Sequence, residues 1–190
     1  MDPPRVLWHH PAMTATSRLG RQIQELLAAL EEVHAVSALI GGLALAPHKV
    51  VRATQDVDLL TRAADADAIH AALVRLGYRC MHRSADAANY LRADERVDLL
   101  YAHRPIALQL LEEADPRDSA FGTVRVIGLE GLVAFKLQGY VNDSRRTQDL
   151  EDIRALLRAN RDTVDWVRLR EYFRLFNRES LLDEILADVG

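Results

Sequence analysis

The hydrophobic pattern changes character about two thirds of the way along the chain. Up to Ile127, helical stripes alternate with short apolar or alternating runs typical of strands, whereas every patterned segment from Leu129 onward has the helical period. This order predicts an α/β part, in which helices pack on a mixed sheet, followed by an all-helical part. We therefore expect residues 1–127 to form an α/β core that starts with a helix, and residues 128–190 to form a small helical subdomain.

The same patterns place the individual elements. Leu19, Ile23 and Leu26 recur at helical spacing and predict a first helix over 16–33. Pro47 limits a short helix over 43–46. Strands are expected over 36–40, 50–51, 57–60, 78–82, 89–92, 97–101 and 121–127, with further helices over 65–76, 105–113, 129–141, 145–160, 164–176 and 181–189.

Charge and cysteine content exclude several classes of protein. The chain has 190 residues, with 24 Lys and Arg against 28 Asp and Glu, so its net charge of −4 provides no global attraction to nucleic acid or anionic lipid. A lone cysteine, Cys80, excludes a disulfide framework and a cysteine-rich zinc site. The first residues lack a signal-peptide pattern, and the longest run without a charged residue, 33–48, is too short to span a bilayer. These features predict a cytoplasmic protein.

Three aspartates lie in the same apolar context on expected strands. Asp56 and Asp58 are two residues apart, so their side chains project to one face of a strand while Val57 points into the core. Asp98 follows Val97 on a second expected strand, and if the two strands are neighbours, three carboxylates converge. Crowded carboxylates repel unless a hard divalent cation neutralises them, which predicts a Mg²⁺ or Mn²⁺ site. Exposure of Asp56 and Asp58 on a solvated edge strand or turn is the alternative.

Gly41 and Gly42 supply a second feature of the same predicted site. They follow an apolar run and precede a short helix, so the backbone can approach a ligand and the first N–H groups of the helix can bind phosphate oxygens. A plain tight turn is the alternative. Phosphate donors beside a metal site favour phosphoryl-type chemistry, in which Asp98 accepts the proton of the nucleophile.

These motifs resemble those of the nucleotidyltransferase superfamily typified by DNA polymerase β. The family pattern is an apolar residue with Gly-Gly or Gly-Ser, then Asp-apolar-Asp or Glu, then a later carboxylate between apolar residues. Gly41-Gly42, Asp56-Val57-Asp58 and Asp98 match its three elements in order. The resemblance implies a nucleotidyltransferase-type mixed sheet flanked by helices. It also implies transfer of a nucleoside monophosphate from an NTP, with pyrophosphate release.

Two residues before the aspartates are candidates for contact with the nucleotide. Arg52 and Thr54 have the same alternation as Asp56, so they can face the same site. Arg52 would then bind a triphosphate oxygen and Thr54 would order the loop. Exposure on the strand, without a role in binding, is the alternative.

The helical part narrows the resemblance to the AbiEii-type toxin nucleotidyltransferases. Lys136 matches the lysine of one family segment, and Asp149 and Asp152 match the aspartates of a second, although Gly139 and Gln148 depart from the pattern. The resemblance implies nucleotide binding by Lys136, Asp149 and Asp152, and a toxin-type enzyme acting on tRNA, with an antitoxin as partner. From the residues alone, Lys136 can instead extend to solvent, and the aspartates can instead favour the helix dipole.

Arginine stripes on two expected helices are a candidate surface for RNA. The arginines recur at helical spacing and can contact a phosphate backbone, although ion pairs on a solvated face are the commoner meaning of such a pattern. The acceptor therefore stays open among tRNA, a small molecule of the aminoglycoside or lincosamide type, and no acceptor at all in a nucleotide-binding module. The stripes comprise Arg154, Arg158, Arg161, Arg170, Arg174 and Arg178.

Overall fold

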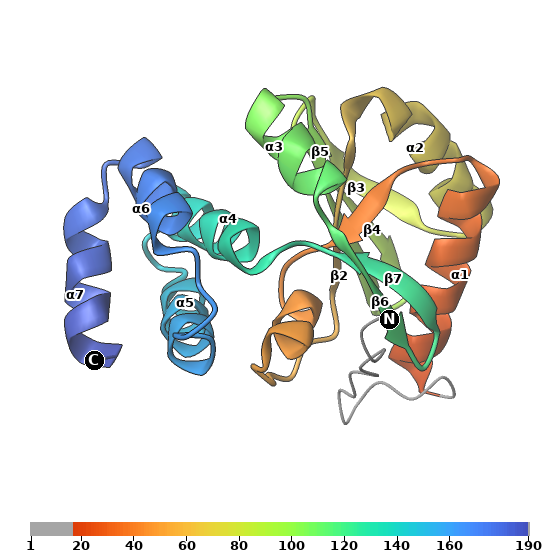
Figure 1. Cartoon of the computed structure of the whole chain (residues 1–190). Helices are drawn as coiled ribbons and strands as arrows, with labels where there is room; N and C mark the ends of the chain where they lie inside the picture. Colours follow the sequence, from red (N-terminus) through yellow and green to blue (C-terminus); the bar gives the residue numbers. More distant parts are fainter. Residues whose placement is uncertain (1–16, 190) are drawn as a thin grey trace.

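The computed structural model describes residues 17–189 and contains one mixed sheet with helices on both faces (Figure 1). The first sixteen positions, which include the expected start of the first helix and the segment without a signal-peptide pattern, lie outside the described residues. The α/β fold class predicted from the sequence is confirmed. The strands of the described part are β1 (Ser37–Leu39), β2 (Val57–Arg62), β3 (Arg79–Arg83), β4 (Ala87–Arg92), β5 (Glu95–Ala102), β6 (Asp115–Ser119) and β7 (Gly122–Val126).

The order of strands in the sheet is β3-β4-β5-β2-β1-β7-β6. Strands β3, β4 and β5 form an antiparallel meander, and β6 and β7 form a hairpin at the other edge. β2 pairs in parallel with β5 and antiparallel with β1, and β1 pairs in parallel with β7. The strand that carries Asp58 therefore lies beside the strand that carries Asp98 at the centre of the sheet.

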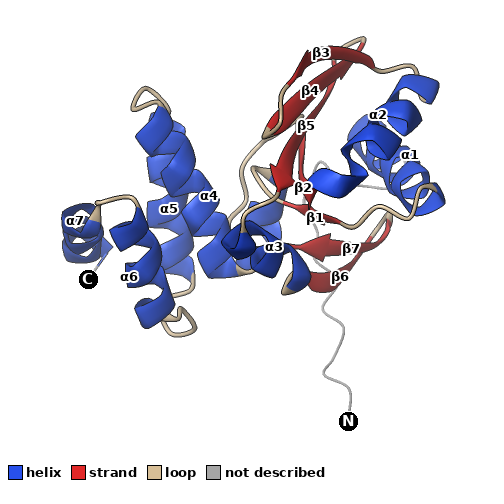
Figure 2. Ribbon diagram, turned by 90° about the horizontal axis from the view of Figure 1, so that it is seen from above, coloured by secondary structure: helices blue, strands red, loops and turns tan. Residues whose placement is uncertain are grey.

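Helices cover the sheet on both sides. In Figure 2, α1 (Arg18–Glu32) and α2 (Ala66–Arg75) lie on one face, and α3 (Pro105–Glu112) lies on the other with the C-terminal helices. The side chain of Ser17 accepts a hydrogen bond from the N–H of Gly20 at 3.0 Å and thereby caps α1. Buried Ile23 and Leu26 on α1 then belong to the core beneath the sheet.

The C-terminal part consists of α4 (Leu129–Asn142), α5 (Thr147–Ala159), α6 (Trp166–Leu175) and α7 (Glu179–Val189). Leu137, Leu156 and Leu169 are fully buried and belong to the same apolar cluster as the sheet residues. No helix within residues 17–189 is long and apolar enough to cross a membrane.

A buried hydrogen-bond chain joins the sheet to α5. His48 ends the 3-10 helix η1 (Leu43–His48), and its Nε2 lies 2.8 Å from the carbonyl oxygen of Ile127. The Nδ2 of Asn160 donates to the carbonyl oxygen of His48 at 2.8 Å. Burial lowers the pKa of His48, which favours a neutral imidazole in this chain of bonds. These contacts fix α5 beside the segment that follows β1.

Three expectations about local structure differ from what is observed. Residues 43–46 lie in a 3-10 helix that contains Pro47, because the segment is too short and too constrained for an α-helix. Residues 50–51 form no strand. Strand β6 was not expected, because its residues are mostly polar and include Pro116; a sheet edge tolerates both.

Candidate functional site

Asp58 and Asp98 lie directly beside each other in the sheet. The parallel register of β2 and β5 pairs them, so both side chains point to the same face. Their neighbours Val57 and Val97 are also paired and are buried on the opposite face. The structure thus brings together two of the three carboxylates singled out in the sequence.

Burial and neighbouring charge raise the pKa of Asp58 to about 6. Removal of the carboxylate from water is the largest cause, followed by repulsion from Asp98 and then from Asp56, which lies one residue before β2. A hydrogen bond from the backbone N–H of Gly42 and the positive charge of Lys136 act in the opposite direction. All three aspartates therefore interact electrostatically, with Asp58 at the centre.

The double-glycine turn packs directly against Asp58. The backbone N–H of Ile40 donates to the Asp58 carbonyl oxygen at 3.0 Å, and the N–H of Gly42 donates to the Asp58 carboxylate. Gly41 has a φ of 62°, and a Cβ added to it would lie 2.0 Å from Asp58 Oδ2. Glycine is therefore required at position 41 both for the backbone conformation and for the space that Asp58 occupies.

The loop before β2 packs against the same turn. A Cβ added to Gly42 would lie 2.8 Å from Thr54 Oγ1 and 3.0 Å from an Nη atom of Arg52. Arg52 is about one third exposed, and its Nε lies 3.2 Å from an oxygen of Asp152 on α5. Arg52 and Thr54 thus lie against the glycine turn, and Arg52 connects that turn to the helical part.

Lys136 lies at the centre of a buried ion-pair network between α4 and α5. Its Nζ is 3.1 Å from Asp149 and 2.7 Å from Asp152, and all three side chains are less than one tenth exposed. The Nε of Arg146 also pairs with Asp149 at 2.6 Å, and the Nε2 of Gln148 donates to Asp152 at 3.0 Å. Lys136 therefore does not extend to solvent. Its positive charge nevertheless lowers the pKa of Asp58, so Lys136 acts electrostatically on the site at β2 and β5.

Asn89 is a site residue that sequence reasoning missed. It pairs with Asp98 in the antiparallel register of β4 and β5, and its Nδ2 donates to Asp98 Oδ1 at 2.7 Å. The sequence carried a signal for it: with Ala93 and Asp94 as a two-residue turn, counting outward along the hairpin places position 89 opposite position 98. The expected strands over 89–92 and 97–101 leave four residues for the turn, and a four-residue turn would place position 91, instead of position 89, opposite position 98.

The acidic residues suit a cation that takes its remaining ligands from water and substrate phosphates. Among the described residues, no group of three or more His, Cys, Asp and Glu side chains is gathered closely enough to hold a metal ion unaided. Asp58 and Asp98 nevertheless offer oxygen donors, and repulsion between these carboxylates helps to raise the pKa of Asp58. Mg²⁺ is commonly held by one or two carboxylates together with water and substrate phosphates. The donor set suits such an ion.

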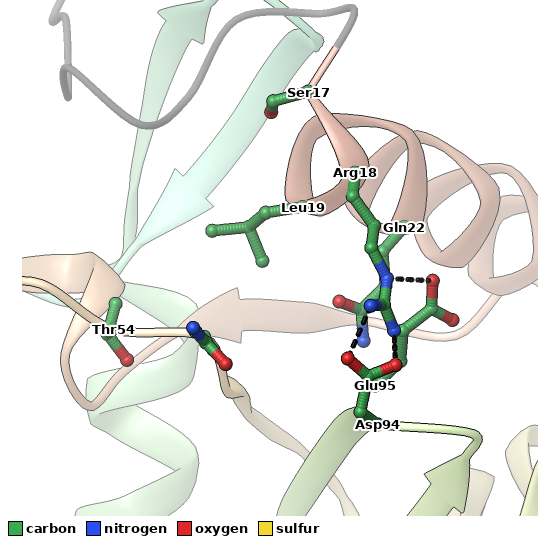
Figure 3. Close-up of a pocket in the computed structure, with 8 residues that line it drawn as sticks. Ser17, Arg18, Leu19, Gln22, Thr54, Asp94 and Glu95 are labelled. Atoms are coloured by element: carbon green, nitrogen blue, oxygen red, sulfur yellow. Dashed lines mark hydrogen bonds and ion pairs between the residues drawn. The ribbon is translucent and has the colours of Figure 1, made fainter.

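A pocket of about 270 Å³ lies near the start of α1 (Figure 3). Arg18 points toward Asp94 and Glu95 and pairs with both (Figure 3). Thr54 contributes to the pocket wall, so the pocket adjoins the loop that packs on Gly42. The carboxylates of Asp94 and Glu95 already neutralise the arginine. The pocket lining comprises Ser17, Arg18, Leu19, Gln22, Thr54, Gln55, Asp94 and Glu95.

The arginine stripes are partly engaged in ion pairs with acidic side chains. Arg154 pairs with Glu151 at 2.7 Å and Arg170 with Asp183 at 2.9 Å. Arg174 pairs with Glu179 at 3.4 Å. Three of the six arginines are therefore ion-paired, as expected for a solvated face that does not bind RNA. The other members, Arg158, Arg161 and Arg178, are exposed.

Comparison with known proteins identifies the fold. The solution structure of the antibiotic-resistance factor ANT(2'')-Ia is 17% identical and matches 90% of this chain and 97% of that chain with a TM-score of 0.63. Lincomycin-bound LnuA, a lincosamide antibiotic adenylyltransferase, is 14% identical and matches 72% of this chain and 94% of that chain with a TM-score of 0.53. A nucleotidyltransferase-like protein from Paracoccidioides brasiliensis is 17% identical and matches 92% and 94% of the two chains with a TM-score of 0.55.

Comparison of the sequence itself adds no assignment. No protein-family model matches the chain, and no curated protein matches it. The fold expected from the superfamily resemblance is therefore shown by structure, while the AbiEii-type resemblance stays a prediction.

Proposed function

We propose that this chain is a divalent-metal-dependent nucleotidyltransferase that transfers a nucleoside monophosphate from an NTP to an acceptor hydroxyl. The observation that carries the proposal is the pairing of Asp58 with Asp98 beside the double-glycine turn, in a sheet with the fold of nucleotidyltransferases. Crowded, partly buried carboxylates cost free energy in the unliganded protein. Such an arrangement is typical of a site that binds a cation.

The acidic residues would hold the metal ion. Asp56, Asp58 and Asp98 would supply carboxylate oxygens. Burial, followed by repulsion from Asp98 and Asp56, raises the pKa of Asp58, and a cation would compensate for this crowded negative charge. The ion would supply electrostatic stabilisation of the charge on the transferred phosphate group. Its other ligands would be water and phosphate oxygens of the NTP.

The transfer itself is an in-line displacement at the α-phosphorus. The acceptor oxygen forms a bond to this phosphorus, the bond from phosphorus to the bridging oxygen breaks, and pyrophosphate leaves. Asp98 accepts the proton of the acceptor hydroxyl as general base. The backbone at Gly41 and Gly42, with Arg52 against it, would bind triphosphate oxygens.

The helical part would complete the nucleotide site through the network around Lys136. Arg52 pairs with Asp152, and Asp152 pairs with Lys136, so the network can fix the position of the loop that lies on Gly42. In this role Lys136, Asp149 and Asp152 orient Arg52. Direct contact of Lys136 with phosphate would require partial release from the two aspartates.

A small-molecule acceptor is the candidate that the observations favour. Structures with this fold include ANT(2'')-Ia in complex with adenylyl-2''-tobramycin and lincomycin-bound LnuA. The ion pairs of Arg154, Arg170 and Arg174 reduce the positive surface that a tRNA acceptor would use. We therefore propose nucleotidyl transfer to a small hydroxyl compound, and treat label in tRNA as an alternative outcome of the test.

The experiment follows radioactive label from the α-phosphate of each NTP, with Mg²⁺, into the small-molecule, RNA and protein fractions of a cell extract. The wild-type chain should label small molecules and release pyrophosphate. The double variant Asp56→Ala, Asp58→Ala should abolish transfer while remaining folded. The matched control is Asp115→Ala, Asp118→Ala, which removes two carboxylates from edge strand β6. Full activity in the first double variant would refute the assignment. Nucleotide binding without transfer by the wild type would indicate a binding module.

A further inference from the structure

A row of polar side chains crosses three neighbouring strands on the face that carries the site. Asp58 on β2 pairs with Asp98 on β5, and Asp98 pairs with Asn89 on β4. Paired residues in a sheet point to the same face, and neighbouring strands lie about 4.8 Å apart. Asn89 is therefore the flanking residue of Asp98 on the side away from Asp58.

Asn89 holds one oxygen of the Asp98 carboxylate. Its Nδ2 donates to Asp98 Oδ1 at 2.7 Å, a short distance for a bond from nitrogen to oxygen. The terminal torsion of an aspartate is broad, so a carboxylate without such a partner rotates readily. The bond from Asn89 restrains this rotation and engages one of the two lone pairs of Oδ1, so Oδ1 can still face a cation while Oδ2 accepts the proton.

From this geometry we propose that Asn89 is a positioning residue that orients Asp98 toward the acceptor hydroxyl. The inference rests on the proposed function, because it assigns Asn89 a role through the general base of that reaction. Asn89 itself touches neither the NTP nor the reacting atoms in this role. Its amide fixes the carboxylate, and Asp98 takes the proton as the acceptor oxygen attacks the α-phosphorus.

The chemistry of the asparagine side chain suits this task. A lysine or arginine at position 89 would also donate to Asp98, but its charge would compensate the carboxylate and weaken its interaction with a cation. A neutral amide orients the carboxylate and leaves its charge in place. Asparagine is also disfavoured in strands, and Asn89 lies inside β4 between two buried core residues, Ala88 and Tyr90. Local strand preference does not account for an amide at this position.

The test separates orientation of Asp98 from structural support. Asn89→Leu removes the donor at nearly constant size, Asn89→Gln retains a donor one methylene further out, and Asn142→Leu is the matched control at an exposed position on α4. Binding of a non-hydrolysable ATP analogue with Mg²⁺ gives the affinity and the number of competent sites. The rate of label transfer to the extract's small molecules, measured at saturating NTP, is then divided by that number.

We expect Asn89→Leu to bind the analogue within twofold of wild type and to lower the rate per competent site at least tenfold. Asn89→Gln should recover at least threefold over Asn89→Leu, and Asn142→Leu should match wild type. If Asn89→Leu does not fold, Asn89→Ala removes the amide without added bulk and gives the same comparison.

Three results would overturn the inference. A rate per site within twofold of wild type in Asn89→Leu would show that orientation by Asn89 is unnecessary. A fall in the number of competent sites with an unchanged rate per site would assign Asn89 a structural role. An inactive wild type would refute the proposed function and this inference with it, whereas an active wild type with an unimpaired Asn89→Leu refutes the inference alone.

Discussion

Gly41 and Asp58 are packed so closely that a Cβ at position 41 would lie 2.0 Å from Asp58 Oδ2. The same Cβ would lie 2.7 Å from the Asp58 Cβ, so rotation of the carboxylate alone cannot relieve the contact. The glycine turn thus shapes the position of a site carboxylate, in addition to any contact it makes with phosphate.

Substitution Gly41→Ala should displace Asp58 and lower both stability and transfer. The positive φ alone costs about 1–2 kcal/mol for an alanine, and the contact with Asp58 adds to this. Gly122→Ala is the matched control, because Gly122 also has a positive φ but a Cβ there meets nothing within 4 Å. Urea unfolding and transfer assays should show a larger loss of stability at position 41 and loss of activity only there. Equal effects at the two positions would contradict the packing argument.

The raised pKa of Asp58 predicts a pH-dependent difference between wild type and Asp58→Asn. Because the folded state holds this proton up to about pH 6 and the unfolded state releases it near 3.8, the wild-type free energy of unfolding falls as pH rises between these values. At about 1.4 kcal/mol per pKa unit, the loss approaches about 3 kcal/mol.

Asp58→Asn lacks this proton equilibrium, so its stability relative to wild type should rise between pH 4 and pH 7. The measurement is urea unfolding in the presence of a chelator, with Asp162→Asn, an exposed carboxylate on a loop, as the control. Added Mg²⁺ should stabilise the wild type more than the variant. A difference that stays constant across this pH range would refute the interpretation.

Removal of the buried cation at Lys136 should strongly destabilise the protein. Lys136→Met leaves Asp149 and Asp152 with only their arginine and glutamine partners in a buried environment, so we expect a loss of about 3 kcal/mol or more. Combining Lys136→Met with Asp149→Asn should restore part of the stability, because one of the two buried negative charges that lose Lys136 is removed. Arg145→Met is the control, since the Arg145 side chain is 88% exposed and its replacement should change stability little. Thermal unfolding checks all three, and an unchanged melting temperature in Lys136→Met would contradict the network.

Local patterns in the sequence predicted most helices and strands because apolar periodicity directly reports which face is buried. The stripe of Ile23 and Leu26 and the alternation around Val57 and Val97 both correspond to buried faces. Strand β6 was not predicted because it is an edge strand, and an edge strand needs no apolar alternation. The strand expected over 50–51 was wrong because two valines favour a strand locally, but they pair with no neighbouring strand of the sheet.

The site was only partly predictable for a related reason. Asp58 and Asp98 could be chosen from their apolar context, but the register that pairs them joins segments forty residues apart and is set by the sheet as a whole. Asn89 could have been found from the tight turn of its hairpin, since that register is local. The partners of Lys136 depend on how α5 packs against α4, which apolar periodicity does not specify.

The most direct test of the central claim is the transfer rate of Asp98→Asn per nucleotide-binding site. This substitution keeps the size of the side chain and removes the base, and general bases contribute about 10²–10⁴-fold to rate. We predict that Asp98→Asn still binds the Mg²⁺ complex of an ATP analogue and transfers label at least a hundredfold more slowly than wild type. Transfer within twofold of the wild-type rate would contradict the assignment of Asp58 and Asp98 to one nucleotidyltransferase site.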